Sequence, residues 1–383
     1  MTKTQRKTTK TPPRTSPNKA SSTGRLKLCE IWHKSNLLKR IFAIFCALLI
    51  LWTGVLYATA QAYIFSQRDK PITYGVTYIP SYARYFGLDD KQTMQAMIDE
   101  LGVRQFRLVS YWNVGEQTRG TYDFSELDWQ MQKAEASGSK VSLAIGLRQP
   151  RWPECHMPEW AKPLPMSEWR VELKKYMQAT IERYKTSPAL QSYQLENEFF
   201  LDVFGICPDH SRERLVDEYK FVKQIDSQHP IIVSRSNNAQ GLPLGEPRPD
   251  VSAVSIYKRV WDKTITKRYV EYPFPAWFYA SLAGGGKLFT GRDLIIHELQ
   301  AEPWMPEGFM INDVKDIKEQ DKSMNAERLK DRIEYAKATG MKEIYLWGAE
   351  WWYWRKVTAN DPSTWNVARD ELTRIRNQQA AKQ

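Results

Sequence analysis

Short apolar runs and longer amphipathic segments alternate along the chain from Thr73 onward. The amphipathic segments repeat apolar residues every three to four positions, as surface helices do, and the apolar runs are short and continuous, as in buried parallel strands. The predicted strands cover residues 73–78, 105–109, 140–145, 192–196, 231–234, 253–256, 294–297 and 343–346. The predicted helices cover residues 90–101, 124–137, 166–184, 212–226, 326–339 and 362–378. Eight strands alternating with helices predict an α/β fold, a (β/α)8 TIM barrel over residues 73–378.

Three glycines support this division into elements. Gly102, Gly138 and Gly340 each follow a predicted helix and precede a predicted strand, as glycines that end helices do. Two helices of the barrel pattern are weak, the fifth between residues 237 and 250 and the sixth within the aromatic segment 272–283. A doubly wound open sheet is the alternative fold, but no GxGxxG turn follows the first strand, which argues against dinucleotide binding.

The segment before the barrel is an uncharged run of 25 residues, 41–65, which predicts a single transmembrane helix. Lys39 and Arg40 precede the run, and this basic flank predicts a cytoplasmic N-terminus. An uncleaved signal anchor is favoured over a cleaved signal peptide, because the run is longer than the apolar region of such peptides. The barrel is then expected outside the cytoplasm, extracellular or periplasmic, at the cell surface on a single-pass protein of the cell membrane. The bilayer is a predicted partner through residues 41–65.

The first forty residues have a different composition from the rest. They hold eleven Lys and Arg against one acid, Glu30, and few apolar residues, which predicts a disordered cytoplasmic arm over residues 1–40. This arm carries +10 of the formal net charge of +11, so about +1 remains for everything else. The charge therefore indicates no nucleic-acid partner for the folded domain. Residues 66–72 are predicted to be a linker and 379–383 a tail.

Carboxylates stand where two of the predicted strands end. Glu196, Asn197 and Glu198 close the fourth strand, and Glu298 closes the seventh. An unpaired charge is costly to bury inside a strand, and the loops after the strands form the active face of a (β/α)8 barrel. These carboxylates are therefore candidate catalytic groups, although an N-cap or a salt-bridged strand end is the alternative for residues 196–198.

Aromatic residues also gather just past the strand ends. The chain has 15 tryptophans, and the predicted rim includes Trp112, Tyr257 and Trp347. Sugar rings combine apolar C–H faces with hydroxyl groups, so flat aromatics and hydrogen-bonding groups together suit a carbohydrate. Packing of the loops is the other interpretation of these aromatics, and it applies to some of them.

The domain from about Thr73 onward resembles the retaining glycoside hydrolases of the large (β/α)8 clan, clan A, which includes β-galactosidases, β-mannanases and cellulases. The second-strand region of the clan's β-galactosidases is similar to residues 106–112, FRLVSYW, and 120–128, GTYDFSELD. Asn197-Glu198 is similar to the clan's Asn-Glu pair, Glu298 matches the place of the nucleophile, and Trp347 matches a sugar-stacking aromatic. The chain departs from several members in having no histidine at the third strand end, and its aromatic stretch after strand six matches none of them.

The resemblance implies hydrolysis of β-glycosidic bonds in an oligo- or polysaccharide with retained configuration. Glu198 would be the acid/base and Glu298 the nucleophile of a double displacement. The residue types suit these roles: Arg107 and Tyr257 can hold an ionised Glu298, and Glu198 near a second carboxylate should have a raised pKa. Asn197 is expected to reach the sugar 2-hydroxyl. The predicted substrate-binding residues are thus Arg107, Trp112, Asn197, Tyr257 and Trp347.

Several alternatives remain open from the sequence. Glu302 and Glu350 are rival nucleophiles, and Glu196 is either a partner of the catalytic pair, pointing the same way as Glu198, or a polar group of the barrel core. A transglycosylase would use the same covalent intermediate. A glycan-binding barrel without activity would keep the tryptophans and need neither carboxylate.

The sequence lacks the motifs of metal sites, serine hydrolases and nucleotide-binding P-loops. The five histidines are not in HxxxH or cysteine-rich spacing, so no metal is expected. There is no GxSxG elbow and no P-loop, and no cofactor is expected. Cys155 and Cys207 follow neighbouring strand ends and are a candidate disulfide in an oxidising compartment; two free thiols are the alternative.

Overall fold

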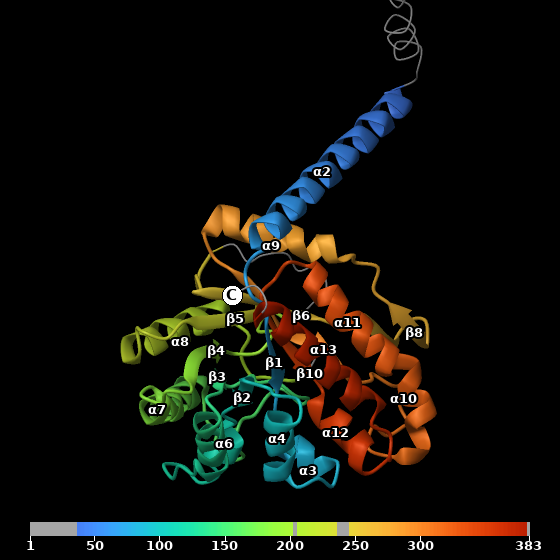
Figure 1. Ribbon diagram of the computed structural model, residues 1–383. Coiled ribbons are helices and arrows are strands. Elements are labelled where there is room, and N and C mark those ends of the chain that lie inside the picture. The colour runs from blue at the N-terminus through green and yellow to red at the C-terminus, as the bar shows by residue number, and fades with distance from the viewer. Residues whose placement is uncertain (1–36, 202–204, 236–244, 381–383) are drawn as a thin grey trace, which may run out of the picture. The chain divides into compact units, whose positions relative to one another are not determined.

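The computed structural model describes residues 37–201, 205–235 and 245–380. Eight parallel strands close into a barrel in the order β1-β10-β9-β6-β5-β4-β3-β2, so the predicted (β/α)8 fold is confirmed (Figure 1). The barrel strands are β1 (Thr73–Thr77), β2 (Gln105–Val109), β3 (Lys140–Ile145), β4 (Leu190–Leu195), β5 (Ile231–Arg235), β6 (Val251–Ile256), β9 (Leu294–Gln300) and β10 (Glu343–Trp347). The predicted disordered arm lies outside the described residues as far as residue 36, and so do residues 381–383 of the predicted tail.

Helices surround the barrel as the sequence pattern predicts. The longer ones are α4 (Asp90–Asp99), α6 (Ser125–Ala136), α7 (Met166–Tyr184), α8 (Arg212–Ile225), α9 (Ala276–Thr290), α11 (Ala326–Ala338) and α13 (Ser363–Ala380). Shorter ones are α3 (Pro80–Tyr85), α5 (Trp112–Gly115), η1 (Val314–Asp316), α10 (Ile317–Ser323) and α12 (Ala349–Val357). Gly102, Gly138 and Gly340 have φ of 65°, 65° and 78°, the left-handed conformation expected of glycines that end helices.

The weakly predicted region after the sixth barrel strand contains more than a helix. A two-stranded antiparallel hairpin, β7 (Arg259–Asp262) and β8 (Arg268–Glu271), precedes α9. The helix begins at Ala276, later than the start of the aromatic segment, and extends to Thr290. Residues 236–244, where the weak fifth helix was expected, fall outside the described residues, and none of the described residues between β5 and β6 is helical.

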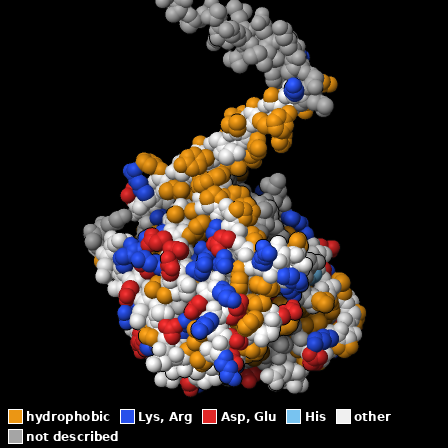
Figure 2. All heavy atoms as spheres, turned by 90° about the vertical axis from the view of Figure 1, so that its right-hand side faces the viewer, with side chains coloured by type: hydrophobic (Ala, Val, Ile, Leu, Met, Phe, Trp, Pro, Cys, Tyr) orange, Lys and Arg blue, Asp and Glu red, His pale blue; other side chains and the backbone are white. Residues whose placement is uncertain are grey.

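The apolar segment before the barrel is one helix, α2 (Leu37–Gln67). It is the one helix in the described part of the chain that is long and apolar enough to cross a membrane. Hydrophobic side chains cover its surface (Figure 2). The chain's two compact units meet inside this helix, so residues from Leu56 onward belong to the barrel unit.

The end of α2 is part of the barrel unit's core. Ala60, Tyr63 and Gln67 are buried, and Ile64 lies against Gly340, where an added Cβ would be 3.2 Å from the Ile64 Cα. The predicted linker 66–72 is thus partly helical. Because Gly340 precedes β10, this end of α2 lies at the amino ends of the strands, away from the rim where the candidate catalytic residues are found.

Candidate active site

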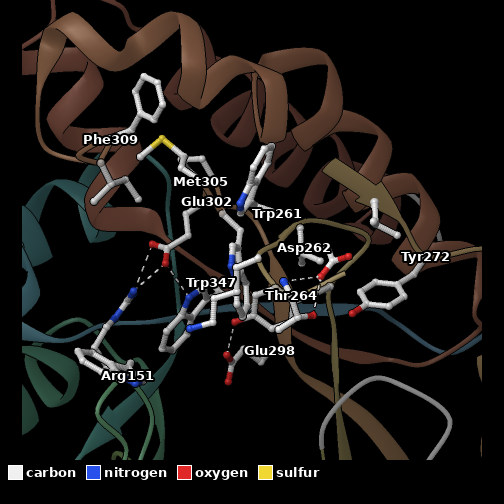
Figure 3. Close-up of a pocket in the computed structure, with 18 of the residues that line it drawn as sticks. Arg151, Trp261, Asp262, Thr264, Tyr272, Glu298, Glu302, Met305, Phe309 and Trp347 are labelled. Atoms are coloured by element: carbon white, nitrogen blue, oxygen red, sulfur yellow. Dashed lines mark hydrogen bonds and ion pairs between the residues drawn. The ribbon is translucent and has the colours of Figure 1, made fainter. Parts of the chain in front are cut away.

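A cavity of about 960 Å³ opens at the carboxyl ends of the strands (Figure 3). Glu198 from the end of β4 and Glu298 from β9 both line it, together with Tyr257 after β6 and Trp347 at the end of β10. The fold therefore brings into one cavity four of the seven residues to which the sequence assigned catalytic or substrate-binding roles.

Glu298 is presented by an irregular part of β9. The pairing register of β9 shifts against both neighbours around His297, because Ile296 and then Glu298 pair with consecutive residues of β6. Such bulges re-aim side chains near active sites. The Glu298 carboxylate accepts a hydrogen bond from the Tyr257 hydroxyl on one oxygen and pairs with Arg107 Nη1 at 3.0 Å on the other.

Arg107 of β2 links the end of β4 to β9 beneath the cavity. Its Nε donates to Gln194 Oε1 at 2.6 Å and its Nη2 to Asn197 Oδ1 at 2.7 Å, in addition to the Glu298 pair. Arg107 is fully buried and does not line the cavity. The prediction that it binds substrate is therefore corrected: the guanidinium positions Glu298 and Asn197 instead.

Glu198 lies in a different environment from Glu298. Its backbone N–H donates to Ser234 Oγ at 3.0 Å, and its φ of 42° turns the chain sharply after β4. Burial, and after it the charge of Glu298, raises the pKa of the Glu198 carboxyl to about 7. A carboxyl with this pKa is half protonated near neutrality and can give up or take a proton there.

A third carboxylate in the cavity, Glu154, had no role assigned from the sequence. Its Oε1 accepts from Asn197 Nδ2 at 3.1 Å, and its Oε2 lies 2.8 Å from Arg148 Nη2. Burial and the neighbouring Glu198 charge raise the pKa of Glu154 well above its ordinary value. Asn197 is thus held by Arg107 on one side and Glu154 on the other. It does not line the cavity, so the prediction that it contacts substrate is corrected: Asn197 lies behind the cavity wall.

Glu302 belongs to a cluster on the other side of the cavity. It is paired with Arg151 at 2.7 Å and accepts from Trp347 Nε1 at 2.9 Å (Figure 3). It also accepts from the Tyr82 hydroxyl at 3.0 Å. The Arg151 guanidinium lies 3.4 Å and 4.1 Å from the ring centroids of Tyr82 and Trp347. Trp347 is thereby fixed at the edge of the cavity, and the Glu302 carboxylate already has three donors.

Two predicted site residues lie away from the cavity. Trp112 is fully buried, and its Nε1 donates to Glu116 Oε2 at 2.6 Å. Its predicted contact with substrate is therefore wrong, because α5 turns the ring into the core. Glu350 is also buried outside the cavity lining and accepts from the backbone N–H of Ile79 at 2.7 Å.

Glu196 does not point the same way as Glu198, contrary to the sequence prediction. Strand β4 ends at Leu195, and Glu196 has a φ of 56°, so the strand alternation no longer applies. Its carboxylate binds Arg214 of α8 at 2.9 and 3.1 Å and accepts from the N–H groups of Leu147 and Arg148 at 2.6 and 2.9 Å. Glu196 thus ties the ends of β3 and β4 to α8.

Replacing Arg214, the cation that pairs with Glu196, should destabilise the barrel. Arg214 is buried with Glu196 and with Glu218, which it contacts at 2.7 Å. Arg214→Met should lower the free energy of unfolding by about 3–5 kcal/mol, because it leaves buried carboxylates uncompensated. Urea unfolding of the Leu56–Gln383 unit measures the loss. Lys162→Met, which breaks an exposed pair with Glu159, is the matched control and should cost less than about 1 kcal/mol; equal losses would contradict this assignment.

Cys155 and Cys207 are neighbours in the structure as free thiols in hydrogen-bonding contact. That contact lowers the pKa of Cys155 and, together with burial, raises that of Cys207. The disulfide between them stays a prediction for the protein in an oxidising compartment. Mass spectrometry of unreduced tryptic peptides should show the two peptides joined, and two alkylatable thiols in the native protein would rule the bond out.

The cavity extends from the carboxylates over the β7–β8 hairpin and the segment that follows β9. This part is lined by Trp261 and Tyr272 of the hairpin region and Phe309 after β9 (Figure 3). Val270 and Trp304 also line it. The hairpin turn is held by Asp262, whose carboxylate accepts from the N–H groups of residues 264–266 at 3.0, 3.1 and 2.6 Å. Among the described residues, no group of three or more His, Cys, Asp or Glu is placed to hold a metal ion.

The chain resembles known proteins in structure and not in sequence. No family model matches the chain, and no curated protein matches it. GH5_18 from Streptomyces cattleya in complex with GlcNAc is similar over 72% of this chain and 70% of that chain, with 15% identity and a TM-score of 0.51. GH5_18 from Bifidobacterium longum subsp. longum is similar over 72% and 69%, with 12% identity and a TM-score of 0.51.

One further solved structure differs in length. The β-galactosidase from the Antarctic haloarchaeon Halorubrum lacusprofundi matches 72% of this chain at 15% identity and a TM-score of 0.48, and the chain spans about half of it, 52%. At these identities the likeness concerns the fold. The chain is thus a (β/α)8 barrel, similar in fold to the GH5_18 proteins.

Proposed function

We propose that the chain is a membrane-anchored retaining glycoside hydrolase that cleaves β-glycosidic bonds by double displacement, with Glu298 as nucleophile and Glu198 as acid/base. The proposal rests mainly on Glu198 and Glu298, two carboxyl groups that line one cavity but differ in the groups that surround them. Glu298 receives donors from Arg107 and Tyr257, whereas burial keeps the pKa of Glu198 near 7. Two carboxyl groups whose surroundings differ in this way are suited to separate acid and nucleophile roles.

In the first step, the Glu298 carboxylate attacks the anomeric carbon while Glu198 gives its proton to the leaving oxygen. The bond to the aglycone breaks and a glycosyl ester with Glu298 forms. In the second step, Glu198 takes a proton from water, which attacks the anomeric carbon and releases Glu298. Arg107 and Tyr257 hold the nucleophile in line and accept no proton in either step.

An oligosaccharide or polysaccharide suits the cavity better than a single sugar. Aromatic side chains line it well beyond the carboxylates, at Trp261, Tyr272 and Trp304, and flat rings accommodate the C–H faces of further sugars. The GH5_18 structures are described with GlcNAc and with Manb1-4GlcNAc bound, which supports a carbohydrate substrate. The apolar helix α2 supports a membrane anchor, and the basic residues Lys39 and Arg40 before the apolar run support a barrel outside the cytoplasm.

A substrate screen with the full chain in detergent tests the activity. Chromogenic β-glycosides, β-glucans and β-mannans should include at least one that the parent protein cleaves and Glu298→Gln does not. Longer oligosaccharides as the main product would indicate a transglycosylase. Binding of a glycan without cleavage by the parent protein would contradict the hydrolase and favour a barrel that only binds glycans.

The pH dependence of kcat/KM should follow the Glu198 carboxyl. The raised pKa of about 7 means that the acid is protonated below this pH and loses its proton above it. Activity on a substrate with a poor leaving group should therefore fall about tenfold per pH unit above pH ~7. A dinitrophenyl glycoside needs little protonation and should show a weaker decline. A decline of the same size on both substrates would contradict Glu198 as the acid.

A further inference from the structure

Helix α9 packs directly against the last turns of α2. Gly284 lies so close that an added Cβ would be 3.0 Å from both the Thr59 carbonyl oxygen and the Tyr63 Cβ. Trp277 meets Tyr57 edge-on, with ring centroids 5.8 Å apart. Figure 1 shows α9 lying across this end of α2. The contact puts α9 within about one helix diameter, ~10 Å, of a helix predicted to enter the bilayer.

The composition of α9 differs from that of the other barrel helices. One of its 15 residues is charged, Lys287, whereas α11 has seven charged residues among 13. A barrel helix normally turns a charged face to water. Part of α9 is instead covered by the end of α2, and the exposed residues of the helix are its last four, 287–290.

Two large apolar side chains at the end of α9 are mostly exposed. Leu288 is 74% exposed and Phe289 is 85% exposed, at the end of the helix where Lys287 and Arg292 flank them. Exposed Leu and Phe side chains with basic neighbours form the inserted face of helices that lie in a membrane interface, and the opposite face of α9 is buried against the barrel unit. Lys287 is paired with Asp293 at 3.1 Å, and Arg292 suits the phosphates of the lipid headgroups.

We propose that α9 is a second membrane-contacting element, lying in the headgroup region with Leu288 and Phe289 inserted among the acyl chains. The bilayer is the occupant that fits, because the helix packed on α9 is the same one that is predicted to span it. A second copy of the chain fits less well: two side chains bury under ~400 Å², and a stable dimer needs about 800 Å² on each partner. The tether to α2 keeps α9 at the surface, so even a small apolar contact suffices.

A membrane contact through α9 sets which end of the barrel faces the bilayer. The end of α2 lies at the amino ends of the strands and the cavity opens at their carboxyl ends. With α9 seated in the interface, the cavity faces away from the bilayer. A substrate is then a glycan reached from outside the membrane rather than the headgroup of a lipid in the same leaflet.

Photolabelling from the lipid phase tests the inference on the full chain. The protein is reconstituted in vesicles of phosphatidylethanolamine and phosphatidylglycerol with a lipid-soluble aryl diazirine, irradiated and digested with trypsin. The peptide Leu288–Arg292 should carry label at a level comparable to the span peptide, residues 41–68. The matched control is the peptide Thr264–Lys267, which holds Ile265, 87% exposed but on the hairpin beside the cavity, and it should carry several-fold less.

Equal labelling of the two short peptides while the span peptide is labelled would overturn the proposal. So would a concentration-dependent dimer that protects Leu288–Arg292 from label, which would assign this face to a second copy. Absence of label from the span peptide would remove the anchor on which the inference rests. The inactive Glu298→Gln protein should label like the parent, so failure of the catalytic proposal is distinguishable from failure of this one.

Discussion

Glu298→Gln should reduce kcat/KM by roughly 10⁴- to 10⁶-fold, the loss expected when a catalytic nucleophile is removed. The amide keeps the size of the side chain and its hydrogen bond to Tyr257, but it cannot form the glycosyl ester. The rate constants are measured with the substrate that the screen identifies, on protein whose thermal unfolding matches the parent within a few degrees.

Glu302→Gln is the matched control for this variant, because Glu302 lines the same cavity and differs by the same substitution. It weakens the pair with Arg151 that positions Trp347, so kcat/KM should fall by less than about 10²-fold. A larger loss for Glu302→Gln than for Glu298→Gln would transfer the nucleophile role to Glu302.

Glu198→Ala should separate the two chemical steps. An aryl glycoside with a good leaving group needs little protonation, so its first step should survive while the second stalls for want of a base. Turnover should fall by about 10²- to 10⁴-fold. Added azide needs no base and should restore the rate and give a glycosyl azide of retained configuration.

The complementary variant is Glu298→Ala with azide. Here the anion enters from the side of the missing nucleophile, so the glycosyl azide should have inverted configuration. NMR of the two products assigns each glutamate independently of the other. An inverted product from Glu198→Ala would contradict the assignment of both roles.

The sequence predicted the barrel well because its strands and most helices have strong local patterns. Each of the eight barrel strands was predicted to start within two residues of its observed first residue. The glycines after the helices have the expected conformation. Helix α9 was weakly predicted because an apolar helix has no polar face to mark its period. The β7–β8 hairpin was missed because its strands are only four residues long.

In the candidate site, the sequence predicted acids and aromatic residues at strand ends, including Tyr257 and Trp347. Glu198 and Glu298 stand at such ends, and barrel geometry brings them to one rim. Glu154 and Arg151 come from a loop after β3 that has no periodic pattern, so no local signal ties them to the cavity. The direction of Glu196 was wrong because its left-handed backbone conformation, φ 56°, is invisible in the sequence.

The positions of two buried side chains, Arg107 and Trp112, could not be predicted from the sequence. Arg107 was expected at the substrate and instead lies under the cavity, where Gln194, Asn197 and Glu298 satisfy its donors. Trp112 was expected on the rim and instead packs in the core. Both are decided by tertiary contacts that spacing along the chain does not reveal.

Trapping the covalent intermediate tests directly whether Glu298 is the nucleophile. The protein is incubated with an activated fluoro-sugar matching the sugar it cleaves, and the labelled peptides are fragmented by mass spectrometry. We expect the sugar on Glu298, within the tryptic peptide Asp293–Lys315 that also contains Glu302. A sugar on Glu302 or Glu350, or full inactivation without any glycosyl-peptide, would contradict this expectation.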